Sequence, residues 1–99
     1  MATLIKSNIE DRVNQQLPEW KFKNNSLYRE LTFRNFVEAF SFMTAIAIEA
    51  EKMHLHPDCS NVYTKVNINL STHSEGGVTE NDFNLAGKID KIFANIGGK

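Results

Sequence analysis

Cysteine is almost absent from the sequence, since Cys59 is the single one among 99 residues. One cysteine excludes an internal disulfide and suits a reducing compartment. The sequence also lacks any stretch approaching the ~20 apolar residues of a membrane-spanning helix, and its N-terminus lacks the apolar core of a signal peptide. We therefore expect an intracellular protein of the cytoplasm.

Neither sign of charge is in excess. Eleven Lys and Arg against 12 Asp and Glu leave a net charge of −1, and the two signs are mixed along the chain. This balance provides no electrostatic footprint for nucleic acid or for an anionic membrane. The length and a hydrophobic content of 41% predict a single globular domain over residues 1–99. A domain of this size buries only about 60–65% of its unfolded surface, so assembly would add stability.

The first third of the chain predicts a short helix and then a hairpin. Ser7 followed by Glu10 is a capping-box pattern, and it predicts a helix over residues 8–16 that the first proline stops. Residues 20–24 and 27–33 alternate roughly between apolar and polar side chains. The Asn-Asn-Ser sequence between them is typical of a turn, so the two segments are predicted to pair as strands.

A long amphipathic helix is predicted next. Its apolar residues follow the i, i+3, i+4, i+7 spacing of one helix face: Phe33, Phe36, Val37, Phe40, Met43, Ala47 and Ala50. The helix should end near Lys52, before Pro57. It carries more large apolar residues than one sheet face needs, which indicates either contacts between subunits or a well-filled core.

The last third predicts strands followed by a helix. Residues 62–66 and 67–71 form a strand region, in which Val66, Ile68 and Leu70 share one face, until the two glycines at 76 and 77 interrupt it. Thr79 with Asp82 three residues later begins a helix. Its apolar positions are Phe83, Ala86, Ile89, Phe93 and Ile96, and the glycines at 97 and 98 end it. Together the elements predict an α+β fold of two layers, with helices packed on one face of an antiparallel sheet.

All three histidines lie in two polar segments, Glu51–Pro57 and Ser71–Ser74, each at the end of a regular element. Taken singly, each histidine is most simply a solvated loop residue, because imidazole is readily hydrated at a protein surface. Together, two histidines can supply both an acid and a base in one turnover. That function requires the two segments to converge in space.

Two other kinds of chemistry are weaker alternatives. Nitrogen, oxygen and sulfur donors for a metal are present in His54, His56 and His73, with Glu51, Asp58 or Cys59. Their spacing matches no structural zinc pattern, so we expect no metal site. A thiol nucleophile at Cys59 has no neighbouring group in the sequence that would activate it.

The sequence around these segments resembles the pterin-4a-carbinolamine dehydratases. The matching runs are Glu51-Lys52-Met53, Pro57, Asn61–Val66, Leu70–His73, Gly76–Glu80 and Asp82–Ala86, within a resemblance that covers about Pro18 to Phe93. It implies a four-stranded antiparallel sheet with helices on one side and a homodimer or homotetramer. It also implies dehydration of a 4a-hydroxytetrahydropterin to quinonoid dihydropterin during tetrahydrobiopterin recycling. No metal, nucleotide or prosthetic group is implied.

The resemblance also implies the site residues. His56 and His73 occupy family histidine positions and are expected to be the catalytic acid and base, in an order that the sequence leaves open. The residues expected to contact the substrate are Glu51, His54, Leu55, Ser71, Thr72, Ser74 and Asp82. Glu51 would either orient an imidazole or bind the amino-pyrimidine edge of the pterin. For Asp82, stabilising the start of the last helix is favoured over binding.

The sequence departs from the family at Leu55, where the first histidine of a pair is expected. A leucine can neither donate nor accept a proton. If the segment is extended, His54 and His56 project to the same side, and His54 could take over the missing function. The alternative is a catalytically impaired protein that serves as a protein-interaction module, as some relatives do as dimerisation cofactors for a transcription factor.

Overall fold

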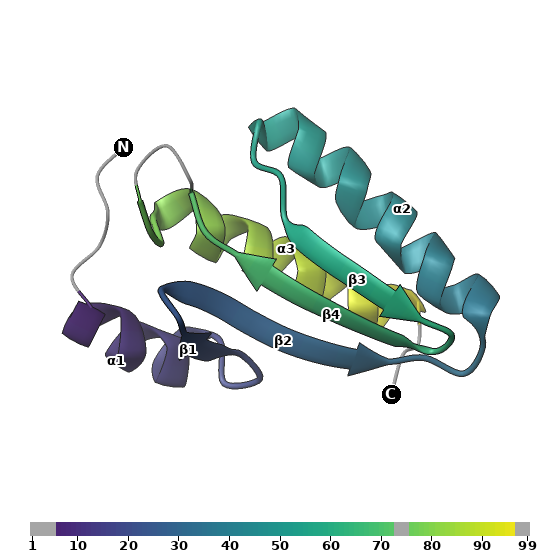
Figure 1. Cartoon of the computed structure of the whole chain (residues 1–99), viewed down its shortest axis with the longest axis horizontal. Helices are drawn as coiled ribbons and strands as arrows, with labels where there is room; N and C mark the ends of the chain where they lie inside the picture. The colour runs from purple at the N-terminus through teal and green to yellow at the C-terminus, as the bar shows by residue number, and fades with distance from the viewer. Residues whose placement is uncertain (1–5, 73–75, 97–99) are drawn as a thin grey trace.

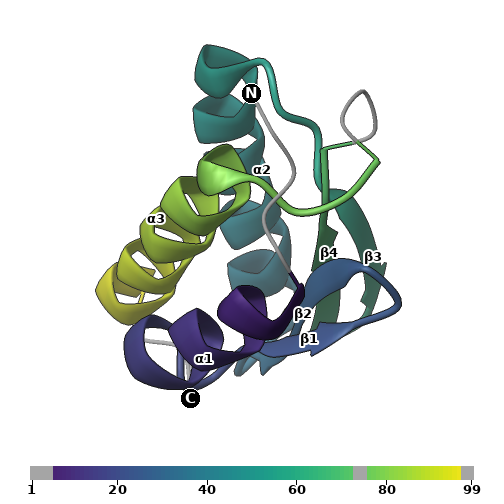
Figure 2. The ribbon, with the colours of Figure 1, turned by 90° about the vertical axis from the view of Figure 1, so that its left-hand side faces the viewer.

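The computed structural model describes residues 6–72 and 76–96, and these form a four-stranded antiparallel sheet with three helices on one face (Figures 1 and 2). In chain order the elements are α1 (Lys6–Gln16), β1 (Lys21–Lys23), β2 (Ser26–Thr32), α2 (Phe36–Met53), β3 (Asp58–Val62), β4 (Lys65–Leu70) and α3 (Glu80–Ile96). The strands lie in the order β1-β2-β4-β3. The predicted α+β fold of two layers is confirmed.

The hairpin predicted near the N-terminus is present, and its turn consists of two asparagines. Asn24 and Asn25 have φ angles of 52° and 62°, and they are flanked by the pair Lys23 and Ser26. Two successive residues with positive φ form the turn that matches the twist of a tight hairpin. Asparagine tolerates this left-handed conformation better than other residues with a side chain.

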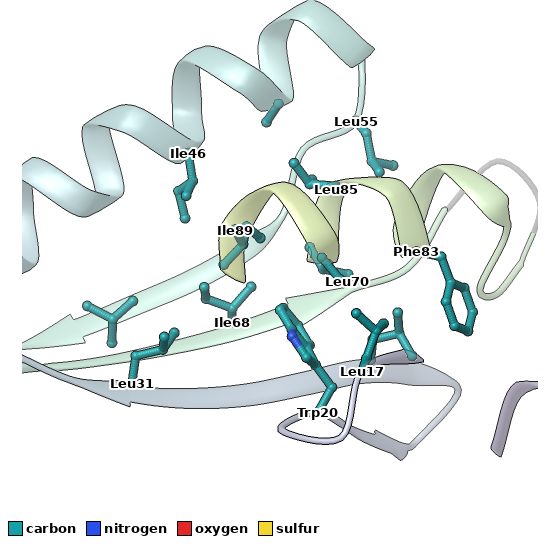
Figure 3. Packing of buried hydrophobic residues seen from close by; sticks show 14 of the residues in the cluster. Leu17, Trp20, Leu31, Ile46, Leu55, Ile68, Leu70, Phe83, Leu85 and Ile89 are labelled. Carbon is teal, nitrogen blue, oxygen red and sulfur yellow. The ribbon is translucent and has the colours of Figure 1, made fainter. Parts of the chain in front are cut away.

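The core lies between the sheet and the helices (Figure 3). Val66, Ile68 and Leu70 of β4 are completely buried, as their alternation predicted. Because β4 is a central strand, these side chains meet residues from both α2 and α3, including Ile46 and Ile89. Burial of each such side chain stabilises the fold by about 1.5–3 kcal/mol. The opposite face of the sheet carries polar residues and is not covered by the helices.

The buried face of α2 differs from the apolar stripe that the spacing indicated. Its buried residues are Ala39, Phe42, Ile46 and Ala50. Within the predicted stripe, Phe36, Val37 and Phe40 are instead 48%, 73% and 56% exposed. The helix is apolar over much of its circumference, so spacing alone did not identify the face that meets the sheet. The surplus apolar residues therefore lie outside the core of the chain.

The predicted start of α2 was also wrong. Phe33 extends the end of β2 and its N–H donates to the carbonyl of Thr64 over 2.8 Å. The helix begins after Asn35, whose side chain accepts the N–H of Glu38 over 2.9 Å. This is N-cap geometry, which satisfies a backbone donor that the first turn cannot pair. Apolar spacing has no means of detecting such a cap.

The strand region predicted over residues 62–71 is in fact a hairpin. Strand β3 ends at Val62, and Tyr63, with a φ of 52°, lies in the turn before β4. Val62 and Tyr63 are 76% and 66% exposed. The prediction took these apolar residues as the start of a strand and therefore placed the strand too late in the chain. The prediction missed β3 because an edge strand exposed along much of its length lacks a strong apolar alternation.

The N-terminal segment is tied to α3 by charged groups. Arg12 of α1 pairs with Glu80, and its guanidinium lies 4.2 Å from the ring centroid of Phe83. Further along α3, Asp90 pairs with Arg29 and accepts the indole N–H of Trp20 over 2.9 Å. These contacts hold α3 across the sheet. No helix in the described part of the chain is long and apolar enough to cross a membrane.

Candidate functional site

His56 and Glu51 come together where the chain leaves α2. His54 follows the helix in a left-handed conformation, with φ 54° and ψ 37°, and its N–H meets the carbonyls of Ala50 and Glu51. The chain therefore reverses and brings His56 back beside the last turn of the helix. The Nε2 atom of His56 lies 2.9 Å from Oε1 of Glu51.

The Glu51 contact selects one tautomer of His56. An ionised carboxylate can only accept hydrogen bonds, so the hydrogen of neutral imidazole resides on Nε2. The Nδ1 atom is then the acceptor. The two side chains are 73% and 75% exposed, and such an exposed pair contributes at most about 1 kcal/mol. Its effect is therefore to orient the imidazole more than to stabilise the fold.

Two hollows meet at His56. The first, of about 260 Å³, lies beside α2 and β3 and is lined by Met43, Ile46, Ala47, Ala50, Glu51, His56, Pro57 and Cys59. The second, of about 100 Å³, is lined by Ser26, His56, Asp58, Asn69 and Ser71. His56 and Ser71 thus line one hollow, which means that the two polar segments singled out from the sequence do converge.

The polar lining of the second hollow comes from three adjacent strands. Asn69 of β4 is paired with Asp58 of β3 on one side and with Tyr28 of β2 on the other. Alternate residues of a strand share a face, so Asn69 and Ser71 lie opposite the buried Ile68 and Leu70. Sequence analysis missed Ser26 and Asn69 as candidates, and it considered Asp58 only as a possible metal ligand. The polar positions of the alternating pattern in β4 were the available signal.

A hydrogen-bonded network fixes the segment after β4. Thr72 forms an isolated antiparallel bridge with Gly77, in which its N–H donates over 2.7 Å. Its hydroxyl lies 2.9 Å from the hydroxyl of Thr79 and donates to Oδ2 of Asp82 over 3.0 Å. The same carboxylate oxygen accepts the N–H of Thr79 over 2.9 Å. Thr79 and Asp82 are completely buried, so this network positions the backbone on both sides of the loop.

Other residues expected in the site are placed differently. Leu55 is 6% exposed and points toward α3, on the side where Leu85 lies (Figure 3). His54 is exposed and lines neither hollow. Because its backbone is left-handed, the extended geometry that would align it with His56 is absent. His73 and Ser74 lie outside the described residues.

Cys59 has the properties of an unreactive thiol. Burial, with a smaller effect from the Asp58 carboxylate, raises its pKa from 9.0 to about 11. The protonated thiol is therefore the dominant form near neutral pH, and only the thiolate is a good nucleophile. Within residues 6–72 and 76–96, no three His, Cys, Asp or Glu side chains are grouped so that they could hold a metal ion.

Comparison with known sequences identifies a family. Residues 2–92 match the family described as pterin 4 alpha carbinolamine dehydratase. A protein of Prochlorococcus marinus strain NATL2A, assigned as a pterin-4-alpha-carbinolamine dehydratase, is 46% identical over 92 residues, which cover 93% of this chain and 97% of the relative. A relative with the same assignment from strain MIT 9313 is 45% identical over 91 residues, which cover 92% of this chain and 95% of its own.

Solved structures show the same fold. A transcriptional coactivator/pterin dehydratase from Brucella melitensis superimposes with a TM-score of 0.85 at 35% identity, covering 91% of this chain and 97% of its own. A pterin dehydratase-like protein, a RuBisCO assembly factor of the alpha-carboxysome, gives a TM-score of 0.62 at 23% identity. That alignment covers 81% of this chain and 89% of the other, and it shows similarity of fold alone.

Proposed function

The chain belongs to the pterin-4a-carbinolamine dehydratase family, its close homologues make it an enzyme of class EC 4.2.1.96, and we propose that His56 and His73 perform the acid–base chemistry of the reaction. The substrate is a 4a-hydroxytetrahydropterin and the product is quinonoid dihydropterin, as required for tetrahydrobiopterin recycling. The observation that carries the proposal is the shared hollow of His56 and Ser71, the latter two residues before His73.

The reaction needs one proton donor and one proton acceptor. Protonation of the 4a-hydroxyl lets the carbon–oxygen bond break with release of water. Loss of the proton on the adjacent ring nitrogen supplies the electron pair of the new carbon–nitrogen double bond. Glu51 holds the hydrogen of His56 on Nε2, so Nδ1 of His56 suits the role of base. His73 is then the acid that protonates the hydroxyl.

The polar hollow supplies groups that suit the pterin itself. The amino-pyrimidinone edge of a pterin presents donors and acceptors side by side. Asp58 and Asn69 offer a carboxylate and an amide on the uncovered sheet face beside His56, and Ser71 adds a hydroxyl. Leu55 lies in the core, and we assign it to support of the loop instead of contact with the substrate.

The test follows the decay of the carbinolamine by its ultraviolet absorbance. The wild-type protein should accelerate this decay, and His56→Ala and His73→Ala should each lower the rate about 100-fold or more. The exposed Lys91 on α3 provides a control, since Lys91→Ala should leave the rate unchanged. A wild-type rate equal to that in buffer would exclude the enzyme function. It would instead favour the alternative of a protein-interaction module.

We further propose that the chain forms a homodimer or homotetramer through α2. Phe36, Val37 and Phe40, together with Ser41 and Thr44, line a hollow of about 420 Å³ on its uncovered face. Large apolar patches are uncommon on monomers, and a twofold axis places the same patch on both partners. Light scattering should give a multiple of the 11.3 kDa chain mass. Phe40→Glu should lower that mass, whereas Lys91→Glu should not. A monomeric wild type would contradict the assembly.

A further inference from the structure

The turn between β1 and β2 contacts the loop that follows β4. The side-chain Nδ2 of Asn25 donates to the carbonyl oxygen of Gly76 over 2.7 Å, although the two residues are 51 positions apart. Asn25 lies outside the motifs that carry the family resemblance, whereas Gly76 begins one of them. Asn24, Asn25 and Ser26 share a hollow of about 320 Å³ with Ser71, Gly76 and Gly77, so the turn forms one wall beside the segment with Ser71.

Gly76 is next to the residue that anchors the loop. Gly77 pairs with Thr72, and their backbone N–H groups donate to each other's carbonyls over 2.7 and 3.3 Å. The pairing sets the place of Thr72, and thereby of Ser71 in the hollow with His56. A hydrogen bond to Gly76 therefore acts directly beside Gly77, the residue that pairs with Thr72. Gly76 has a φ of 75°, a conformation that residues with side chains rarely adopt.

The residues at the Thr72–Gly77 bridge are thus held from two independent elements. From α3, Asp82 and Thr79 bind the hydroxyl of Thr72. From the opposite side, Asn25 binds the carbonyl of Gly76. The first set is part-buried and the second is exposed. An exposed hydrogen bond adds little to stability, yet a displacement of about 1 Å in a reacting group can cost 100-fold in rate.

We propose that Asn25 is a positioning residue for the dehydration and acts by fixing Gly76, beside the bridge between Thr72 and Gly77 that sets the place of Ser71. This inference rests on the proposed function. Glycine would satisfy the turn at this position, because Asn-Gly is a preferred pair for two successive positive φ angles. Asparagine keeps the same backbone and adds a donor that reaches Gly76. Turn chemistry therefore accounts for the backbone at Asn25, and loop positioning accounts for its side chain.

The test uses two substitutions at Asn25 and the same two at Asn24. Asn25→Gly creates an Asn-Gly turn, which preserves or stabilises the hairpin while it removes the donor. Asn25→Asp preserves the shape but places a carboxylate oxygen against the Gly76 carbonyl. Asn24→Gly and Asn24→Asp alter the same turn and leave Asn25 in place. We expect both Asn25 variants to lose about tenfold in kcat with a smaller change in KM. Both Asn24 variants should stay within about twofold of wild type, and Asn25→Gly should not lower the thermal midpoint.

The outcomes separate this inference from the proposed function. Full activity of both Asn25 variants overturns the inference, and so does an equal loss in the Asn24 variants, which would trace to the turn itself. If the wild type has no dehydratase activity, the proposed function fails, and with it the role of Asn25 in the dehydration. Amide hydrogen exchange then decides whether Asn25 holds the bridge between Thr72 and Gly77. Exchange at Thr72 and Gly77 should be at least about fivefold faster in Asn25→Asp than in Asn24→Asp. Equal exchange rates in those two variants overturn it.

Discussion

Glu51 contacts His56 through a chain reversal at the end of α2, so that a helix residue orients an imidazole five positions later. The left-handed His54 makes this reversal possible. The pair is exposed to solvent, whereas Leu55 between its members is buried. The short segment therefore exposes the Glu51–His56 pair to solvent, while Leu55 packs in the core.

Replacement of Glu51 by glutamine should lower kcat/KM about fivefold. The exposed pair contributes at most about 1 kcal/mol, and 1.4 kcal/mol corresponds to a tenfold change in rate. The side-chain amide of glutamine can both donate and accept a hydrogen bond, so it would no longer select the Nε2–H tautomer of His56. Glu49→Gln is the matched control, because Glu49 lies on the same helix and pairs with Lys52 and Lys88 instead. Steady-state dehydration kinetics of the two variants should differ, and equal rates would remove Glu51 from the mechanism.

Replacement of His54 by glycine should stabilise the protein by about 1 kcal/mol. A residue with a side chain is strained in the left-handed conformation, and glycine is the usual residue after a helix end. Urea unfolding measures this gain. The dehydration rate should remain within about twofold, because His54 lines neither hollow at His56. A more stable but much slower variant would show that His54 does supply the missing imidazole function.

Introduction of histidine at Leu55 should destabilise the fold by about 1–3 kcal/mol at neutral pH, because a polar ring would be buried without a partner. The loss should increase at pH 5, where burial opposes protonation of the new imidazole. Leu55→Met conserves volume and should cost less than about 1.5 kcal/mol. Since Leu55 faces the core, we expect little change in rate. A tenfold gain in rate would contradict this placement.

Replacement of Asp82 by asparagine should lower the free energy of unfolding by about 1–3 kcal/mol. The carboxylate oxygen accepts from both the Thr79 N–H and the Thr72 hydroxyl, within a buried network at the start of α3. Glu80→Gln is the control in the same helix turn, since Glu80 is exposed and its substitution should cost much less. Denaturant unfolding compares the two variants. Equal losses would exclude the buried network as the source.

Alkylation of Cys59 should be about 100-fold slower at pH 8 than alkylation of a free cysteine. Burial and Asp58 raise its pKa from 9.0 to about 11, and each pKa unit lowers the thiolate fraction tenfold. The contribution of the protonated thiol to the free energy of unfolding is fully present below pH 9.0 and is lost as the pH rises through about 11. Reaction with iodoacetamide over pH 7–11 tests the shift. A rate matching that of unfolded protein would contradict it.

Periodicity was reliable where one side of an element is buried and the other is solvated. The alternation of Val66, Ile68 and Leu70 predicted the buried face of β4. Residue type predicted the first hairpin turn, where Asn24 and Asn25 lie between β1 and β2. Periodicity failed at α2, which is apolar on both its covered and its uncovered sides. It failed again at β3, an edge strand with little apolar character.

The sequence by itself determined the two-layer fold, the family and the two segments that hold the histidines. These properties depend on local patterns and on ordered motifs, which a linear sequence contains in full. The tertiary structure alone decided that His56 and Ser71 share a hollow, that Leu55 faces the core and that Asn25 reaches Gly76. Each of these depends on where the chain turns and on which strands become neighbours, because a single left-handed residue or strand register changes the direction of every side chain that follows.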